Sequence, residues 1–551
     1  MTYLTQDLKR PEIGRGRSGI VYLQDTGEGS QLACKVFDSR GLTKVVQILT
    51  LGAPNPYVWN ADAVQCARLR RNILEALVPI WTDGKVGVAE AVAALRNDEH
   101  QTFELQTRMV RGWAAHLHHP LSDEFDGEAE GLWHDAMPSL RKHLTEAGFD
   151  GLLWQAGEGN PVALNNFLFE PDRHDAPARD GTPPTGRWIW IDLESGVPAI
   201  FPLSLKVLFS YSLRHWRRLG RPMFDDVDVG RLTAYLEENA DALKHALGAA
   251  AYDDLVANAR HLGEHQSRWK SVGRHDSSIQ YRLMRGDIDQ AEAAYFTEHR
   301  LRWRLTEAKR ALLSLGKALK AGGRAVAGLV RRINLTKAVS STWKYLASQT
   351  YRETFIQDFL RQRIEKWQKR GQLNDRDAQR LLEQVGAPDA SVYMTDFGIH
   401  LAIKPAVKAV QYWVLPALFA FGVLNAATLA VLILAGGSLA RSAYTLGRLL
   451  QSAARGAEKP WIALWVGVLP IVGNLAYPAQ MIYSSGGKDE KLAQFMMDDG
   501  FARVGRHLPI WGGEDTWTEH AWNRVPYRIS RYLKTRWQRK TSELSPTGLR
   551  I

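Results

Sequence analysis

The feature that most constrains the fold is a glycine-rich turn between two apolar runs near the N-terminus. Its glycines are Gly14, Gly16 and Gly19. After a second, polar turn the chain carries Ala33 and Lys35, a lone lysine inside an apolar run. Glycines let backbone N–H groups come close to phosphate oxygens, and a lysine on the next strand would reach the same phosphates, with Val21 covering a base. The pattern predicts a phosphate-binding turn; a plain β-hairpin with an unrelated lysine is the alternative.

Two other glycine motifs fit this stretch less well. A dinucleotide-binding motif opens a helix, whereas residues 20–23 continue as a strand. A Walker-type loop ends in Gly-Lys-Ser/Thr, and this stretch has no such ending. The stretch resembles the protein-kinase-like superfamily, over roughly the first 200 to 275 residues. The resemblance implies a bilobal domain that binds ATP and Mg²⁺, in which Glu75, on a helix predicted over residues 61–77, pairs with Lys35. A surface position for Glu75 is the alternative.

An apolar strand that ends in a carboxylate supplies the candidate metal ligand. The apolar residues 188–191 are followed by Asp192. By the resemblance, Asp192 takes the place of the metal-binding Asp of the kinase Asp-Phe-Gly motif, and Glu194 is a candidate second ligand. Either Asn165 or Asn166 would be the metal-binding asparagine of the catalytic loop, and the sequence leaves that choice open. An aspartate that only caps a turn is the alternative.

The catalytic base is the gap in this pattern. Kinase loops carry an Asp four or five residues before the metal-binding Asn, whereas residues 155–161 contain none. Asn160 stands at that position if Asn165 is the ligand, and an amide accepts no proton at neutral pH. Glu158 is the nearest carboxylate and would serve only after a loop shift. General-base help is worth roughly 10²–10⁴-fold, so the chain is either a slow phosphotransferase or a pseudokinase.

Composition narrows the choice of partners. The 551 residues carry a net charge of +11, which favours anionic partners. Only Cys34 and Cys66 occur, which excludes a disulfide framework and indicates a reduced compartment. No aromatic–basic RNA motif is present, and we expect no nucleic-acid partner. The N-terminus lacks the pattern of a signal peptide. The cluster of His116, His118 and His119 has no further ligand type at metal spacing, and we expect it at the surface.

Two stretches without charge suggest membrane association. They cover residues 409–440 and 460–487, begin near Trp413 and Trp461, and are long enough to cross a bilayer core of about 20 helical residues. We expect both to be membrane-inserted, either as a hairpin or as a re-entrant segment; a buried hairpin is the alternative. Ten basic residues against one acid between Arg302 and Lys337 predict a basic amphipathic helix on an anionic lipid surface.

The expected fold class is α+β, with a bilobal kinase-like domain followed by a mostly helical region with two membrane-inserted apolar segments. The expected divisions are a small lobe (1–112), a large lobe (113–275), a basic helical linker region (276–400), membrane-inserted helices (401–487) and a basic Trp-rich tail (488–551). The expected function is a membrane-tethered, ATP- and Mg²⁺-dependent phosphotransferase acting on a membrane-associated protein or (glyco)lipid. The kinase-like domain would face the cytoplasm. A nucleotide-binding pseudokinase that serves as a membrane scaffold or switch is the alternative.

Overall fold

The computed structural model divides the chain into two compact units. Unit 1 comprises residues 1–116, 127–319 and 509–511; unit 2 comprises residues 117–126, 320–508 and 512–551. The structure describes residues 10–16, 18–27, 31–39, 41–115, 119–121, 131–157, 163–172, 186–194, 224–310, 313, 340, 344–345, 347–387, 391–415, 418, 423–469, 472–484, 490–506 and 519.

Unit 1 begins with an antiparallel sheet that contains the glycine-rich turn. Its five strands run in the order β1-β2-β3-β6-β5. Their bounds are Glu12–Arg15 (β1), Gly19–Asp25 (β2), Gln31–Phe37 (β3), Ala91–Asn97 (β5) and Thr102–Arg108 (β6). The glycine-rich turn joins β1 to β2, and the register places Val21 opposite Lys35. The strand–turn–strand prediction for this stretch is therefore confirmed.

Helix α3 (Ala61–Trp81) packs on β5 and β6 and confirms the helix predicted over residues 61–77. The Asn60 side chain caps its first turn by accepting from the Ala63 N–H at 2.9 Å. Its buried apolar residues recur every three or four positions, as a core-facing helix requires. Two further helices, α1 (Gly41–Leu51) and α2 (Pro56–Trp59), precede α3.

A second sheet carries the strand that leads to Asp192. Its order is β4-β9-β8-β7, with β4 parallel to β9 and the other neighbours antiparallel. The bounds are Val86–Val88 (β4), Trp113–Ala114 (β7), Phe167–Pro171 (β8) and Gly186–Trp190 (β9). Residues 86–97 are shared between the two sheets. β4 pairs with β9 as far as the Ala89 N–H, and β5 then pairs with β6.

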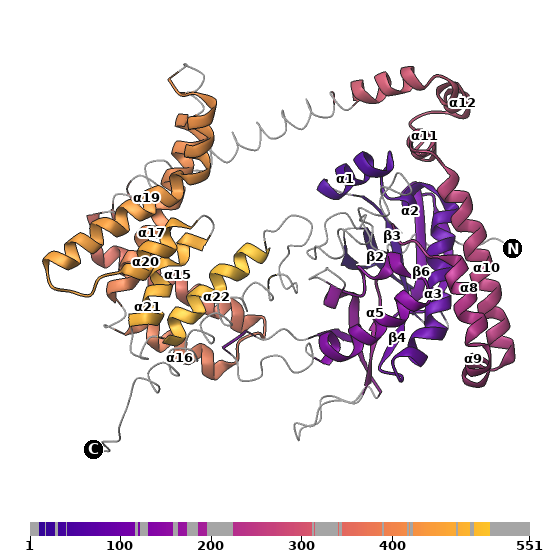
Figure 1. Cartoon of the computed structure of the whole chain (residues 1–551), viewed down its shortest axis with the longest axis horizontal. Coiled ribbons are helices and arrows are strands. Elements are labelled where there is room, and N and C mark those ends of the chain that lie inside the picture. Colours follow the sequence, from indigo (N-terminus) through magenta and orange to yellow (C-terminus); the bar gives the residue numbers. More distant parts are fainter. Residues whose placement is uncertain are drawn as a thin grey trace. The chain divides into compact units, whose positions relative to one another are not determined.

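Helices complete unit 1. They include η1 (Leu132–Ala136), α5 (Met137–Glu146), η2 (Asp150–Leu152), η3 (Ala163–Asn166), α8 (Val229–Glu238), α9 (Ala240–Leu247), α10 (Ala249–Ser271), α11 (Arg274–Met284) and α12 (Gln290–Glu298). Helix α10 lies alongside α3 and α8 (Figure 1).

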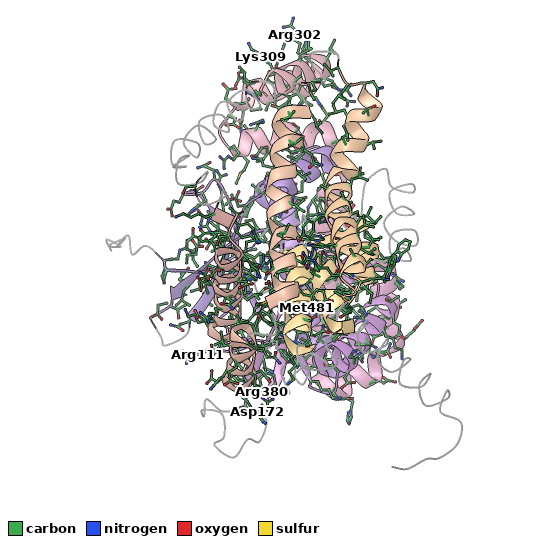
Figure 2. The ribbon with its side chains drawn as sticks, turned by 90° about the vertical axis from the view of Figure 1, so that its left-hand side faces the viewer. Arg111, Asp172, Arg302, Lys309, Arg380 and Met481 are labelled. Atoms are coloured by element: carbon green, nitrogen blue, oxygen red, sulfur yellow. The ribbon has the colours of Figure 1, made fainter. Side chains whose placement is uncertain are left out.

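The predicted basic helix is described only in its first part. Residues 300–310 are helical, and Trp303 packs into a small apolar cluster with Ile279, Ile288 and Ala293. Arg302 and Lys309, labelled in Figure 2, are exposed. Residues 314–339, which carry most of the predicted basic face, lie outside the described residues.

Unit 2 is built from helices. Their bounds are Gln349–Lys369 (α15), Asp375–Gly386 (α16), Ser391–Ala409 (α17), Val410–Val414 (η6), Ala426–Ala454 (α19), Trp461–Val468 (α20), Val472–Leu475 (η7), Ala476–Ser484 (α21) and Glu490–Arg506 (α22). On α15, Ile356, Leu360, Ile364 and Trp367 recur every three or four residues and are buried in the main core cluster of the unit.

The expectation that His119 lies at the surface is wrong. The ring is fully buried in unit 2, with its centroid 4.9 Å from that of Trp367 and 5.3 Å from that of Phe495. Its Nδ1 accepts from the Leu121 N–H at 3.2 Å. Burial lowers the pKa of His119 to about 3, so the ring is neutral at physiological pH. His116 and His118 lie outside the described residues.

The prediction of two membrane-inserted segments, and with it that of transmembrane helices, is wrong. Within the described part of the chain, no helix combines the length and the apolar character that crossing a bilayer requires. The second apolar run is divided into α20 of 8 residues, η7 of 4 and α21 of 9. Each is far shorter than the about 20 residues that a bilayer core demands.

The second apolar run instead contributes to the interior of unit 2, whereas Val423, Val431 and Leu439 of the first run are exposed. Ala463 of α20 and Tyr477 of α21 are fully buried in its core cluster. Helix α19 begins within the first run but continues through Arg448, whose guanidinium binds Asp396 of α17 at 2.8 Å. The fold is therefore a unit of mixed strands and helices followed by a helical unit, without the membrane-inserted part of the expected class.

Candidate functional site

The three glycines of the β1–β2 turn meet different surroundings. A Cβ atom on Gly19 would lie 2.3 Å from the Val36 carbonyl oxygen, so the close approach of β2 to β3 requires glycine there. A Cβ on Gly14 or Gly16 would meet no described atom nearer than 3.9 Å, and neither residue has a left-handed φ. The packing of β2 on β3 therefore requires glycine at position 19. At Gly14 and Gly16 the space beside the backbone is open.

Lys35 and Asp192, 157 positions apart, form the centre of the site. The Lys35 Nζ lies 2.6 Å from Asp192 Oδ1 and 3.5 Å from Glu194 Oε2. The ammonium also lies 5.7 Å from the centroid of the Phe37 ring. The Lys35 side chain is only 13% exposed and that of Asp192 is 36% exposed, so the carboxylate is the more accessible partner. The structure thus brings together the two residues that the sequence singled out for phosphate and metal.

The β8–β9 hairpin places an asparagine beside Asp192. Phe167 pairs with Trp190, and the Ile191 N–H donates to the Asn166 carbonyl at 2.8 Å. The start of β8 and the end of β9 therefore lie at the same edge of the sheet. Asn165 is exposed and Asn166 is half-buried, and this geometry favours Asn166 over Asn165.

The amide of Asn166 is oriented by Gln155. Its Nδ2 donates to the Gln155 carbonyl at 3.1 Å and to Gln155 Oε1 at 3.2 Å. Because the nitrogen is engaged in this way, Oδ1 is the atom of Asn166 that is left to face a cation.

Glu194 is held by Arg71 of α3 in a buried bidentate pair. Arg71 Nε donates to Glu194 Oε1 and Nη2 donates to Oε2, both at 2.9 Å, and each side chain is 1% exposed. Burial alone would raise the pKa of Glu194, but the charges of Arg71 and Lys35 and the hydrogen bonds from Arg71 lower it to about 2. Because both oxygens are occupied, this geometry favours a structural role for Glu194 over the predicted role as second metal ligand.

A second buried network lies one residue away on α3. Tyr57 Oη donates to Asp225 Oδ2 at 2.6 Å, and Arg70 Nη2 donates to the same hydroxyl. Burial raises the pKa of Tyr57 well above its ordinary value, so the hydroxyl keeps its proton. Adjacent arginines on α3 thus serve two separate carboxylates.

The structure gives Glu75 other neighbours than Lys35. The carboxyl is half-buried; burial and the charge of Glu90 raise its pKa, while Arg108 and Arg187 oppose that effect. Arg71, one turn earlier on α3, is the residue of that helix that reaches the site. The sequence reasoning missed Arg71, although a charged residue at a core-facing position of a helix signals a buried partner.

The remaining predicted site residues are Val21, Ala33, Glu158 and Asn160. Val21 and Ala33 are half-buried on β2 and β3, and the Ala33 carbonyl accepts from Thr107 Oγ1 at 3.3 Å. Glu158 and Asn160, the candidates for the base position, lie outside the described residues. A cavity of about 280 Å³ in unit 1 is lined by Trp59, Trp269 and other residues, none of which is a predicted site residue.

The donor set suits a magnesium ion that arrives with phosphate. Among the residues that the structure describes, no group of three or more His, Cys, Asp or Glu side chains is arranged to hold a metal. Mg²⁺ usually keeps several waters and binds through one or two carboxylates together with substrate phosphates. Asp192 is the carboxylate that could meet this smaller requirement, and the amide oxygen of Asn166, at the same edge of the sheet, is the second candidate ligand. Comparison with family models, with curated proteins and with solved structures finds no match for the chain.

Proposed function

We propose that unit 1 binds ATP together with Mg²⁺ and transfers the γ-phosphoryl group to an acceptor. The observation that carries the proposal is the 2.6 Å contact between Lys35 Nζ on β3 and Asp192 Oδ1 at the end of β9. The glycine-rich turn leads into β2, which is the strand paired with β3. Phosphoryl transfer asks the protein for positioning and for compensation of charge, and these residue types supply both.

Each residue has a distinct part in this proposal. The N–H groups near Gly14 and Gly16 would bind phosphate oxygens, and the Lys35 ammonium would leave Asp192 to neutralise the α/β-phosphates. Asp192 and Asn166 would hold Mg²⁺, which supplies charge neutralisation between the β- and γ-phosphates. The hydrogen bonds from Asn166 Nδ2 to Gln155 support this part of the proposal, because they leave Oδ1 to face the ion.

A nucleotide-binding switch without turnover is the second candidate. The observation that favours it is the absence of any aspartate from residues 155–166, where the kinase pattern places the base.

Turnover of γ-labelled ATP by the full chain separates the two candidates. We expect the wild type to release or transfer labelled phosphate. The rate of this reaction should be at least 100-fold lower in Asp192→Asn. Nucleotide binding with a wild-type rate no higher than that of Asp192→Asn would favour the switch. If the wild type binds no nucleotide, both candidates fail.

A further inference from the structure

The segment that carries Asp192 is held on both sides by one arginine. Arg71 Nη2 donates to the Ile191 carbonyl at 2.7 Å, just before Asp192, and the same guanidinium grips Glu194, just after it. Arg71 Nη1 also donates to the Ala89 carbonyl at 3.2 Å, at the end of β4. One side chain of α3 therefore fixes two strand ends.

Asp192 is the accessible carboxylate in this stretch. Leu193 and Glu194 are each 1% exposed, whereas the Asp192 side chain is 36% exposed. The backbone on either side is thus fixed, while the Asp192 carboxylate keeps one side open to solvent and contacts Lys35. A fork of two parallel N–H···O bonds adds geometric precision that a point charge does not.

We propose that the Arg71–Glu194 pair is a clamp that positions Asp192 for metal-dependent nucleotide binding. Arg71 and Glu194 are positioning residues in this proposal, because they act through the segment from Ile191 to Glu194. The proposal rests on the proposed function of unit 1. It assigns to α3 an arginine anchor where the kinase pattern uses a helix glutamate to hold the lysine.

Arg70 provides a matched control. It is adjacent in sequence, it is 2% exposed and it binds buried Tyr57 and Asp225, but within the described part of the chain it donates no hydrogen bond to residues 191–194. Arg71→Lys and Arg70→Lys each keep the charge and remove the planar fork. Glu194→Gln keeps the shape and removes the charge. Arg71→Met with Glu194→Met replaces the buried pair by apolar side chains, a change that often preserves stability.

The test measures the affinity of a non-hydrolysable ATP analogue with and without Mg²⁺, after circular dichroism has established folding. The Mg²⁺ enhancement is the ratio of the affinity with Mg²⁺ to the affinity without it. We expect this ratio to be at least 10-fold smaller in Arg71→Lys, in Glu194→Gln and in the double Met variant. Binding without Mg²⁺ would stay within 2-fold of the wild type, and Arg70→Lys would keep both values.

The possible outcomes separate the clamp from its alternatives. Full Mg²⁺ enhancement in any folded Arg71 or Glu194 variant overturns the clamp. Loss in Glu194→Gln but not in Arg71→Lys would make Glu194 a direct metal ligand, which also overturns it. If the wild type itself binds no analogue, the proposed function fails, and that result is distinct from failure of the clamp.

Discussion

At the scale of single residues, the glycine turn separates what the fold needs from what a ligand would need. Gly19 is required by its approach to Val36, whereas Gly14 and Gly16 have room for a side chain. A sequence motif cannot make this distinction, because all three positions show the same letter. Substitution of Gly19 and substitution of Gly14 or Gly16 should therefore have different effects on stability and on nucleotide binding.

Gly14→Ala and Gly16→Ala should weaken binding of an ATP analogue without loss of stability. The added methyl group would occupy the space beside the backbone and cost roughly one hydrogen bond, or about 0.5–1.5 kcal/mol, which corresponds to about 2- to 10-fold in Kd. Gly19→Ala should instead destabilise the fold by about 1–3 kcal/mol through overpacking against β3. Calorimetric titration and urea unfolding measure the two effects. Equal destabilisation by all three substitutions would contradict this account.

Glu194 should make the stability of unit 1 dependent on pH in the acid range. Its folded pKa of about 2 lies below the usual value of about 4.3, so the stabilisation is present above about pH 4.3 and is lost as the pH falls towards 2. Glu194→Gln should be less stable than the wild type at pH 7 by about 3–5 kcal/mol, since it weakens a buried pair. Urea unfolding at several pH values should show this gap narrowing between pH 5 and 2. A constant gap would argue against the assignment.

The sequence was sufficient to select Lys35 and Asp192, because a lysine within an apolar strand and a carboxylate at the end of one are unusual positions. It was not sufficient to find Arg71 or to choose between Asn165 and Asn166. Those answers depend on which side chains face one another across the sheet edge and α3, and spacing in one chain does not encode such pairings. The roles of Glu158 and Asn160 remain predictions.

At the scale of elements, the sequence pattern predicted α3 and the β1–β2–β3 hairpins. The prediction of membrane insertion for the two apolar runs was based on their length and was wrong. An apolar stretch of bilayer length predicts a spanning helix only if it stays one helix. Here the second run is divided into α20, η7 and α21, and polar pairs such as Arg448–Asp396 join the helices around it. Short apolar helices inside a helical unit and membrane helices share the same composition.

Gly473 should be essential to the packing of η7, whereas Gly447 of α19 should not. A Cβ on Gly473 would lie 2.7 Å from Arg441 Nη2 and 2.8 Å from the Gly467 carbonyl oxygen, whereas a Cβ on Gly447 meets nothing within 4 Å. Gly473→Ala should therefore lower the free energy of unfolding of unit 2 by about 1–3 kcal/mol. Gly447→Ala should raise it by about 0.5–1 kcal/mol, because alanine is the better helix former. Thermal unfolding of both variants checks the prediction, and a stabilised Gly473→Ala would refute it.

At the scale of the whole molecule, the division into two compact units predicts two unfolding steps. Separate cores need not melt together, and a ligand stabilises only the part that binds it. In scanning calorimetry, a saturating Mg²⁺–ATP analogue at about 100 times its Kd should stabilise one step by about 2.7 kcal/mol and leave the other unchanged. Equal shifts of both steps, or a single step, would contradict independent units.

The central claim is that Lys35 and Asp192 together hold a magnesium-bound nucleotide, and its most direct test is the affinity of a non-hydrolysable ATP analogue for the full chain in Mg²⁺. Lys35→Met removes a charged hydrogen-bond donor to phosphate, worth about 1.5–3 kcal/mol, so the account predicts a Kd about 10- to 100-fold weaker than that of the wild type. A wild type that binds no analogue, or a Lys35→Met variant that binds it equally well, would contradict the account.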